Sequence, residues 1–275
     1  MSSSRCSVIR LLAILVIALW TPYAMAQQEI RMSTTTSTEN SGLLAFLLPQ
    51  FEQETGLKVS VIAVGTGKAL ELAKNGDVDV TLVHARPAED KFMRDGYGNV
   101  RRDVMYNDFL LVGTAEDPAR IRGMKDVLAA MKTIAERKSR FISRGDNSGT
   151  DQMEKSYWKA IGITPAGSNT ISAGLGMGAV LAMAAEMKAY TLTDRATYGA
   201  YRAKTGLVVM VEGDPKMFNP YGIIAVNPAK HPHVNHKGAM QLIDWMTSRE
   251  GQKKIAAFKL DGEQLFYPVN AQTVK

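Results

Sequence analysis

Short apolar stretches alternate with amphipathic segments along most of the chain. Leu43, Leu47 and Phe51 recur at every fourth position, a spacing that gives a helix one buried face. Shorter runs rich in apolar and β-branched residues indicate strands between such segments. The pattern predicts strands at residues 29–33, 58–64 and 79–83 and helices at residues 41–54 and 68–75. Strands that alternate with helices in this way are typical of an α/β fold.

Two further extended segments, residues 106–113 and 221–226, bracket a central region of the sequence. If each crosses between two bodies, one lobe is built from both ends of the chain and a second lobe is inserted between the crossings. We therefore expect a first lobe of residues 27–110 and 221–275 and a second lobe of residues 111–220. Ligands of open α/β sheets bind at the carboxyl ends of strands, so a ligand cleft is expected between the lobes.

The first residues have the features of a secretory signal peptide. Arg5 and Arg10 precede an apolar run at residues 11–20, and Ala-Met-Ala at residues 24–26 matches a cleavage site. Residues 1–26 are therefore expected to be removed, which places the mature protein in the periplasm. The single cysteine, Cys6, lies inside this leader, so no thiol remains for disulfides, metal sites or nucleophilic catalysis.

The remaining chain is mildly basic. Loss of the two arginines of the leader lowers the formal charge of +6 by two. Lysine and arginine are scattered and are not interleaved with aromatic residues, so no nucleic-acid partner is expected. No later stretch approaches the roughly 20 apolar residues that span a bilayer, so the protein is not expected to be membrane-embedded. The charge favours a small anionic ligand.

Residues 141–151, Phe-Ile-Ser-Arg-Gly-Asp-Asn-Ser-Gly-Thr-Asp, indicate a strand, a turn and the start of a helix. The first amides of a helix lack intrahelical partners, so Ser148, Gly149 and Thr150 are expected to direct N–H groups and two hydroxyls at one point. Arg144 adds a planar guanidinium that suits oxyanions. These four residues are candidate anion ligands. The alternative is a solvated turn that Ser148 caps, with Arg144 in a surface ion pair.

Residues 33–38 are six consecutive hydroxyl residues between the first predicted strand and helix. Together with turn amides, Thr35, Thr36 and Ser37 are candidates for a concave array of donors, while Ser41 or Asn40 caps the helix. A solvated, hydroxyl-rich loop is the alternative.

Two more strand-to-helix junctions carry donors. Thr66 and Gly67 lie in a Gly-Thr-Gly-Lys turn, which is not a Walker A motif because the earlier glycine and the hydroxyl residue after the lysine are missing. Free N–H groups at another helix start are what remains. Thr193 precedes a further predicted helix, either as its N-cap or as a ligand donor. Four such junctions in one chain favour a shared role over coincidence.

A set of motifs spread over the chain carries a family resemblance. They are residues 34–38 (Thr-Thr-Thr-Ser-Thr), 79–84 (Asp-Val-Thr-Leu-Val-His), 106–109 (Tyr-Asn-Asp-Phe), 143–150 (Ser-Arg-Gly-Asp-Asn-Ser-Gly-Thr), 190–195 (Tyr-Thr-Leu-Thr-Asp-Arg) and 219–222 (Asn-Pro-Tyr-Gly). With these motifs the chain resembles the TupA-type tungstate-binding solute receptors of bacterial ABC importers. The resemblance implies a type II periplasmic-binding-protein fold, whose two α/β lobes close on a tetrahedral oxyanion. It also implies an ABC permease and its ATPase subunit as partners.

The choice among oxyanions depends on protons. Phosphate near neutral pH carries a proton and needs an acceptor in its site, whereas sulfate, molybdate and tungstate present only acceptors. The candidate residues are donors, and Asp146 is expected to pair with Arg144. The resemblance alone favours tungstate over molybdate. A molybdate or sulfate receptor, or the oxyanion sensor subunit of a signalling system, are the alternatives.

Catalysis and metal binding are not expected. Ser148 does not lie in the Gly-x-Ser-x-Gly elbow of a hydrolase, so we expect no enzyme. His231, His233 and His236 are closely spaced, but no carboxylate joins them at ligand spacing, which favours a surface loop. His84 is expected to be a packed or hydrogen-bonding residue. We expect no metal, no cofactor and a monomer.

Overall fold

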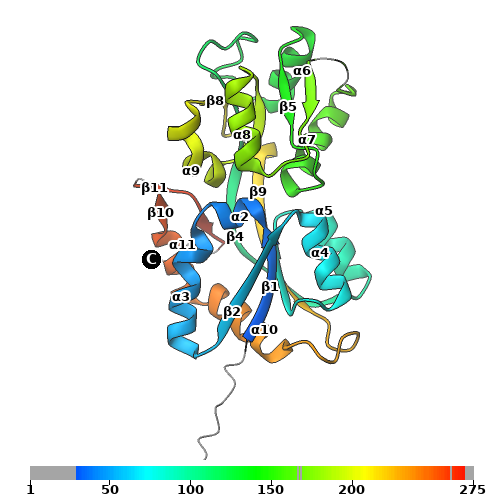
Figure 1. Cartoon of the computed structure of the whole chain (residues 1–275), viewed down its shortest axis with the longest axis vertical. Coiled ribbons are helices and arrows are strands. Elements are labelled where there is room, and N and C mark those ends of the chain that lie inside the picture. The colour runs from blue at the N-terminus through cyan, green and yellow to red at the C-terminus, as the bar shows by residue number, and fades with distance from the viewer. Residues whose placement is uncertain (1–28, 166, 168, 261, 270–275) are drawn as a thin grey trace, which may run out of the picture.

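A computed structural model of the 275-residue chain describes residues 29–165, 167, 169–260 and 262–269. The leader expected at residues 1–26 lies outside this part of the chain. The described residues form two α/β halves, one above the other in Figure 1, and the lower half contains both the first and the last described residues. Within the same residues, no helix has the length and apolar character needed to cross a bilayer.

One eight-stranded sheet runs through both halves. Its order is β12-β4-β9-β3-β1-β2, and β7 and β8 also pair with β4. Strand β1 is parallel to β2 and β3, whereas β9 is antiparallel to β3 and β4. The strands are β1 (Glu29–Thr35), β2 (Lys58–Val64), β3 (Val80–Val83), β4 (Gly98–Gly113), β7 (Thr191–Asp194), β8 (Val208–Val211), β9 (Phe218–Val226) and β12 (Tyr267–Pro268).

Helices flank the sheet in each half (Figure 1). Those of the lower half are α2 (Thr36–Asn40), α3 (Leu43–Thr55), α4 (Thr66–Asn75), α5 (Arg86–Arg94), α10 (His236–Thr247) and α11 (Arg249–Ala257). Those of the upper half are α6 (Val127–Glu136), α7 (Gly149–Ala160), α8 (Met177–Glu186), α9 (Arg195–Thr205) and the 3-10 turn η1 (Pro215–Met217). Two short pairs complete the fold: parallel β5 (Phe141–Ser143) and β6 (Thr170–Ser172), and antiparallel β10 (Lys259–Leu260) and β11 (Glu263–Gln264).

Strand β4 crosses from one half into the other. Its residues 98–108 pair with β9, and residues 109–113 pair with β7 and β8. The extended segment predicted at residues 106–113 is therefore the second part of one 16-residue strand. Separate hydrophobic clusters lie on either side of the crossing: one contains Ile30 and Phe51, and another contains Phe109 and Met131.

The predicted first helix, residues 41–54, is wrong at its start. A short helix, α2, comes first and is capped by Thr35, whose hydroxyl accepts a hydrogen bond from the Thr38 amide. The next helix begins after Gly42, which occupies its N-cap position at a φ of 81°. Asn40 does not cap this helix, whereas the Ser41 hydroxyl accepts a hydrogen bond from the Leu43 amide at 3.2 Å. Glycine adopts the left-handed conformation at little cost, and here that conformation turns the chain sharply between the two helices. Gly56 ends α3 in the left-handed conformation, and the helix extends one residue beyond its predicted end, to Thr55.

The buried carboxylate of Asp79 links two elements of the lower half and contributes to its stability. Its carboxylate is 1% exposed and accepts hydrogen bonds from the backbone N–H groups of Arg31 and Asn235, which join β1 to the start of α10. Asp79→Ala leaves both donors without this acceptor, so we expect unfolding free energy to fall by roughly 2–4 kcal/mol. Urea unfolding measures the loss. The exposed Asp77→Ala is the matched control, and an equal, small effect of both variants would contradict this role.

Candidate functional site

The hydroxyl segment is not the loop that the sequence predicted. Strand β1 extends to Thr35, and helix α2 begins at Thr36. The Thr35 hydroxyl lies 3.0 Å from Ser37 Oγ and 2.7 Å from Thr38 Oγ1, so the segment is folded around its own hydroxyl contacts. Short hydroxyl side chains compete for nearby backbone groups in this way and nucleate a turn of helix. Thr35 and Ser37 are buried, and Thr36 is half-buried.

Arg144 is 1% exposed and lies where the two halves meet. Its Nε donates to Asp146 Oδ2 and to the carbonyl oxygen of Leu175, both at 3.0 Å. Its Nη2 lies 3.0 Å from the same Asp146 oxygen and donates to Thr36 Oγ1 of the lower half at 3.2 Å. Nη1 is buried and has no hydrogen-bond partner among the described residues. One edge of a fully charged side chain is therefore left to bind something else.

The predicted turn from β5 into α7 is present, and the helix begins at Gly149. Ser148 is its N-cap, and the Ser148 hydroxyl accepts from the Asp151 amide at 3.3 Å. The Thr150 hydroxyl is buried and has no partner in the described structure. Because the dipole of α7 favours negative charge at this end, a second unpaired donor lies beside a positive potential.

The glycine turn of the lower half meets this helix start directly. Helix α4 begins at Thr66 with Gly65 as its N-cap, two residues earlier than predicted. Thr66 Oγ1 accepts a hydrogen bond from the Gly149 amide at 2.9 Å. A Cβ added to Gly67 would lie 3.8 Å from Cβ of Asn147, an ordinary van der Waals contact. The two turns thus face each other in contact.

The hydrogen bonds show which donors remain free. The Thr36 hydroxyl accepts from Arg144, and that of Thr66 accepts from Gly149, so each keeps its own proton for a further acceptor. The Thr150 hydroxyl and Arg144 Nη1 have no protein partner within the described residues. Asp146, the nearest carboxylate, is engaged by Arg144 and by the Ser148 amide. The arrangement is rich in donors and has its acceptor already occupied, as expected of Asp146.

Thr193 differs from the other predicted site residues. It is fully buried in β7, and its hydroxyl donates to the carbonyl oxygen of Asp194 at 3.1 Å. Its interpretation as an N-cap is wrong, because Asp194 caps α9 by accepting from the Thr197 amide. Carboxylates and hydroxyls compete for the N-cap position, and the residue one step nearer the helix occupies it here.

His84 is the site residue whose place the sequence did not reveal. It is 4% exposed, its Nε2 lies 3.2 Å from Ser37 Oγ, and its Nδ1 lies 3.0 Å from Asn219 Oδ1. Burial lowers the pKa of His84, and the charge of Arg144 acts in the same direction, whereas Asp194 and the Asn219 bond oppose the shift. The packed, hydrogen-bonding role expected for it is confirmed. Its position directly after β3, at the carboxyl end of a central strand, is the signal that marks it as a site residue.

Of the other histidines, two have backbone partners and one contacts the side-chain amide of Asn99. His231 Nε2 lies 2.9 Å from the Lys74 carbonyl oxygen, and His233 Nε2 lies 3.0 Å from that of Gly76. His236 Nε2 lies 2.8 Å from the Asn99 amide nitrogen. Each ring therefore ties a loop or helix end of the lower half to its neighbour.

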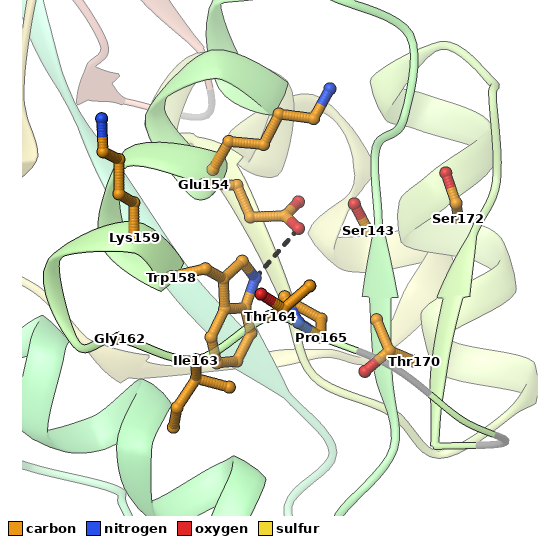
Figure 2. Close-up of a pocket in the computed structure, with 11 residues that line it drawn as sticks. Ser143, Glu154, Trp158, Lys159, Gly162, Ile163, Thr164, Pro165, Thr170 and Ser172 are labelled. Atoms are coloured by element: carbon orange, nitrogen blue, oxygen red, sulfur yellow. Dashed lines mark hydrogen bonds between the residues drawn. The ribbon is translucent and has the colours of Figure 1, made fainter.

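A pocket of about 530 Å³ lies behind the Arg144 turn, in the upper half (Figure 2). Its inner wall carries Glu154, whose carboxylate accepts from Trp158 Nε1 and from the backbone N–H of Arg144, both at 3.2 Å. Burial raises the pKa of Glu154 to about 7, against the lowering effect of its hydrogen bonds. Glu154 thus holds the backbone of Arg144 through a hydrogen bond from within the upper half.

The comparisons with known proteins identify the class first. A family model, the PBP superfamily domain, matches residues 22–250. The tungstate-binding protein TupA of Peptoclostridium acidaminophilum is 48% identical over 88% of this chain and 86% of its own length. The crystal structure of the tungstate ABC transporter from Geobacter sulfurreducens is 54% identical, has a TM-score of 0.79, and covers 85% of this chain and 100% of its own.

A further solved structure, the tungstate-binding protein TupA from Desulfovibrio alaskensis G20, is 46% identical with a TM-score of 0.75 and covers 88% of this chain and 98% of its own. The chain belongs to the TupA-type family of the PBP superfamily. The predicted fold class, an α/β periplasmic-binding-protein fold, is confirmed.

The raised pKa of Glu154 makes stability depend on pH. Because its folded pKa of about 7 lies above the ordinary 4.5, the neutral carboxyl stabilises the fold fully below pH 4.5, and this contribution is lost as the pH rises through 7. Between pH 5 and pH 8 the wild type should lose roughly 2–3 kcal/mol more unfolding free energy than Glu154→Gln. Urea unfolding at both values measures it, with exposed Glu136→Gln as the control. Equal pH dependence in wild type and Glu154→Gln would show that the buried carboxyl is already ionised.

Proposed function

We propose that the protein is a periplasmic receptor that captures tungstate and delivers it to an ABC permease and its ATPase subunit. The relatives named above bind tungstate or belong to a tungstate transporter. A leader at residues 1–26 would supply export to the periplasm. The observation that carries the proposal is the pair of buried donors that have no acceptor among the described residues, Arg144 Nη1 and Thr150 Oγ1. An unpaired buried donor costs free energy, which a ligand made of acceptor oxygens recovers.

We assign the oxyanion ligands to the donors that the two halves bring together. Arg144 supplies the charge, the hydroxyls of Thr36, Thr66 and Thr150 supply neutral donors, and the first amides of α4 and α7 complete the set. The proposed ligands are Thr35, Thr36, Ser37, Thr66, Gly67, Arg144, Ser148, Gly149, Thr150 and Thr193. Thr193 is the weakest member, because its proton is directed at the carbonyl oxygen of Asp194.

We propose the lobes at the boundaries given by the sequence, with residues 27–110 and 221–275 in one and residues 111–220 in the other. The continuity of β4 supports this division, because its partners change from β9 to β7 near Phe109. The cross-half bonds of Thr36 to Arg144 and of Gly149 to Thr66 support a closed arrangement of the lobes around the ligand.

Binding without turnover is the role that the side chains support. A serine nucleophile needs a base within hydrogen-bond reach of its own oxygen. The Ser148 hydroxyl accepts from the Asp151 amide, as an N-cap does, and the nearby His84 contacts Ser37 and not Ser148. Molybdate has the charge and shape of tungstate, so we propose it as a second ligand of the same site, with the order of preference inferred from the relatives.

Arg144→Ala tests the charge of the site. A charge-assisted hydrogen bond in a closed cleft is worth roughly 2–5 kcal/mol, so tungstate should bind about 30-fold or more weakly, with the fold intact. Arg144→Lys keeps the charge but loses the planar fork and should recover only part of the affinity. Calorimetry and circular dichroism measure binding and folding. The exposed Arg122→Ala, in the same half, is the charge-matched control. An unchanged dissociation constant for Arg144→Ala would contradict the assignment of Arg144 as an anion ligand.

Selectivity among oxyanions tests the donor-only character of the site. A protonated phosphate finds no free carboxylate, because Asp146 is engaged, and the unpaired proton costs roughly 1–3 kcal/mol. We expect tungstate to bind most tightly, molybdate next, sulfate much more weakly and phosphate most weakly. Tungstate should also raise the melting temperature, because it binds the folded state. Calorimetry of the four anions decides; phosphate binding as tight as tungstate would mean that an acceptor faces the ligand.

A further inference from the structure

His84 lies at the contact between the two halves. Its ring stacks on Tyr221 at 4.7 Å between centroids, in the lower half. On its other side it meets the start of α7: a Cβ added to Gly149 would come within 2.9 Å of the ring and of the His84 carbonyl oxygen. A glycine at 149 is therefore needed for the halves to meet, and the ring sits directly beside the donors proposed for the oxyanion.

A chain of side chains fixes the ring from behind. Asn219 Oδ1 lies 3.0 Å from His84 Nδ1, and Asn219 Nδ2 donates to Asn107 Oδ1 at 2.7 Å. With the amides in this orientation, Nδ1 carries the ring proton, because a carbonyl oxygen only accepts. Nε2 is then an acceptor, and the Ser37 hydroxyl must donate to it across 3.2 Å. The Ser37 hydroxyl then donates its single proton to His84 and cannot donate a hydrogen bond to an anion.

The same chain has a second proton order. If both amides are reversed, Asn107 donates to Asn219, Asn219 donates to Nδ1, and the Tyr221 hydroxyl, 3.4 Å from the Asn219 amide, donates to the Asn219 oxygen. The Asn107 atom without a partner among the described residues is a nitrogen in the first order and an oxygen in the second. The ring proton then sits on Nε2 and is donated to Ser37. The Ser37 hydroxyl keeps its own proton for the ligand.

We propose that His84 is a positioning residue that sets the direction of the Ser37 hydroxyl, and that oxyanion capture selects the tautomer with the proton on Nε2. One proton leaves Nδ1 and one joins Nε2, so the charge of the ring does not change, and water exchanges the protons before the halves close. The inference rests on the proposed function, because it needs an oxyanion at Ser37. Burial lowers the pKa of His84 and keeps the ring neutral, which supports a change of tautomer and not of charge.

The ring nitrogens report the tautomer directly. In protein labelled with 15N-histidine, the shifts of both nitrogens are recorded by NMR before and after saturation with sodium tungstate. The chain has four histidines. The single variants His231→Gln, His233→Gln and His236→Gln each remove the signals of one ring, so the signals that persist in all three belong to His84. We expect the protonated nitrogen to change from Nδ1 to Nε2. A ring that stays protonated on Nδ1, starts on Nε2, or becomes doubly protonated overturns the proposal.

Affinity separates this inference from the proposed function. If calorimetry detects no tungstate binding, the function fails; if tungstate binds and the tautomer does not change, the role of His84 fails. Ser37→Ala removes the partner of the ring, so we expect about 10-fold weaker binding and no tautomer response. Ser33→Ala is the matched control, because the Ser33 hydroxyl bonds to the Ala69 carbonyl oxygen and to Thr81, and it should retain both affinity and response.

Discussion

The rest of the site depends on the burial of one guanidinium, that of Arg144. Arg144 carries a permanent charge at 1% exposure, and a charge removed from water is stable only when its hydrogen bonds are replaced. Asp146, the Leu175 carbonyl oxygen and Thr36 replace some of them. Because Thr36 comes from the other half, the arginine is satisfied in this way only when the halves touch. The remaining edge needs an acceptor that the described residues do not supply.

Carboxylates around the arginine are placed so that they do not compete with a ligand. Asp146 uses its two oxygens on Arg144 and on the Ser148 amide. Asp194 is buried and accepts from both the amide and the hydroxyl of Thr197. Each carboxylate therefore orders a turn or a helix start, and the donors between them stay free. A site for a fully deprotonated oxyanion needs both properties at once.

The sequence predicted the elements whose signals are local. The four-residue spacing of α3 and the turn after β5 depend on neighbours along the chain, and both are confirmed. The first part of β4 was missed, because Arg101, Arg102 and Asp103 interrupt any apolar pattern. Arg101 forms an ion pair with Glu89, and Arg102 forms one with Asp244. The spacing of apolar and polar residues along the sequence does not reveal such tertiary ion pairs. The His84 chain was missed for the same reason, since it joins residues more than 100 positions apart.

The continuity of β4 has a consequence for how the molecule comes apart. Strand β4 belongs to both halves, because residues 98–108 pair with β9 in one half and residues 109–113 pair with β7 and β8 in the other. If either half unfolds, its section of β4 loses its own ladder hydrogen bonds, and the section that remains ends in a frayed strand at the junction near Phe109. We therefore expect the two hydrophobic clusters to unfold together. Ligand bound at a single point between the halves then protects the entire polypeptide against local opening, including segments far from the anion.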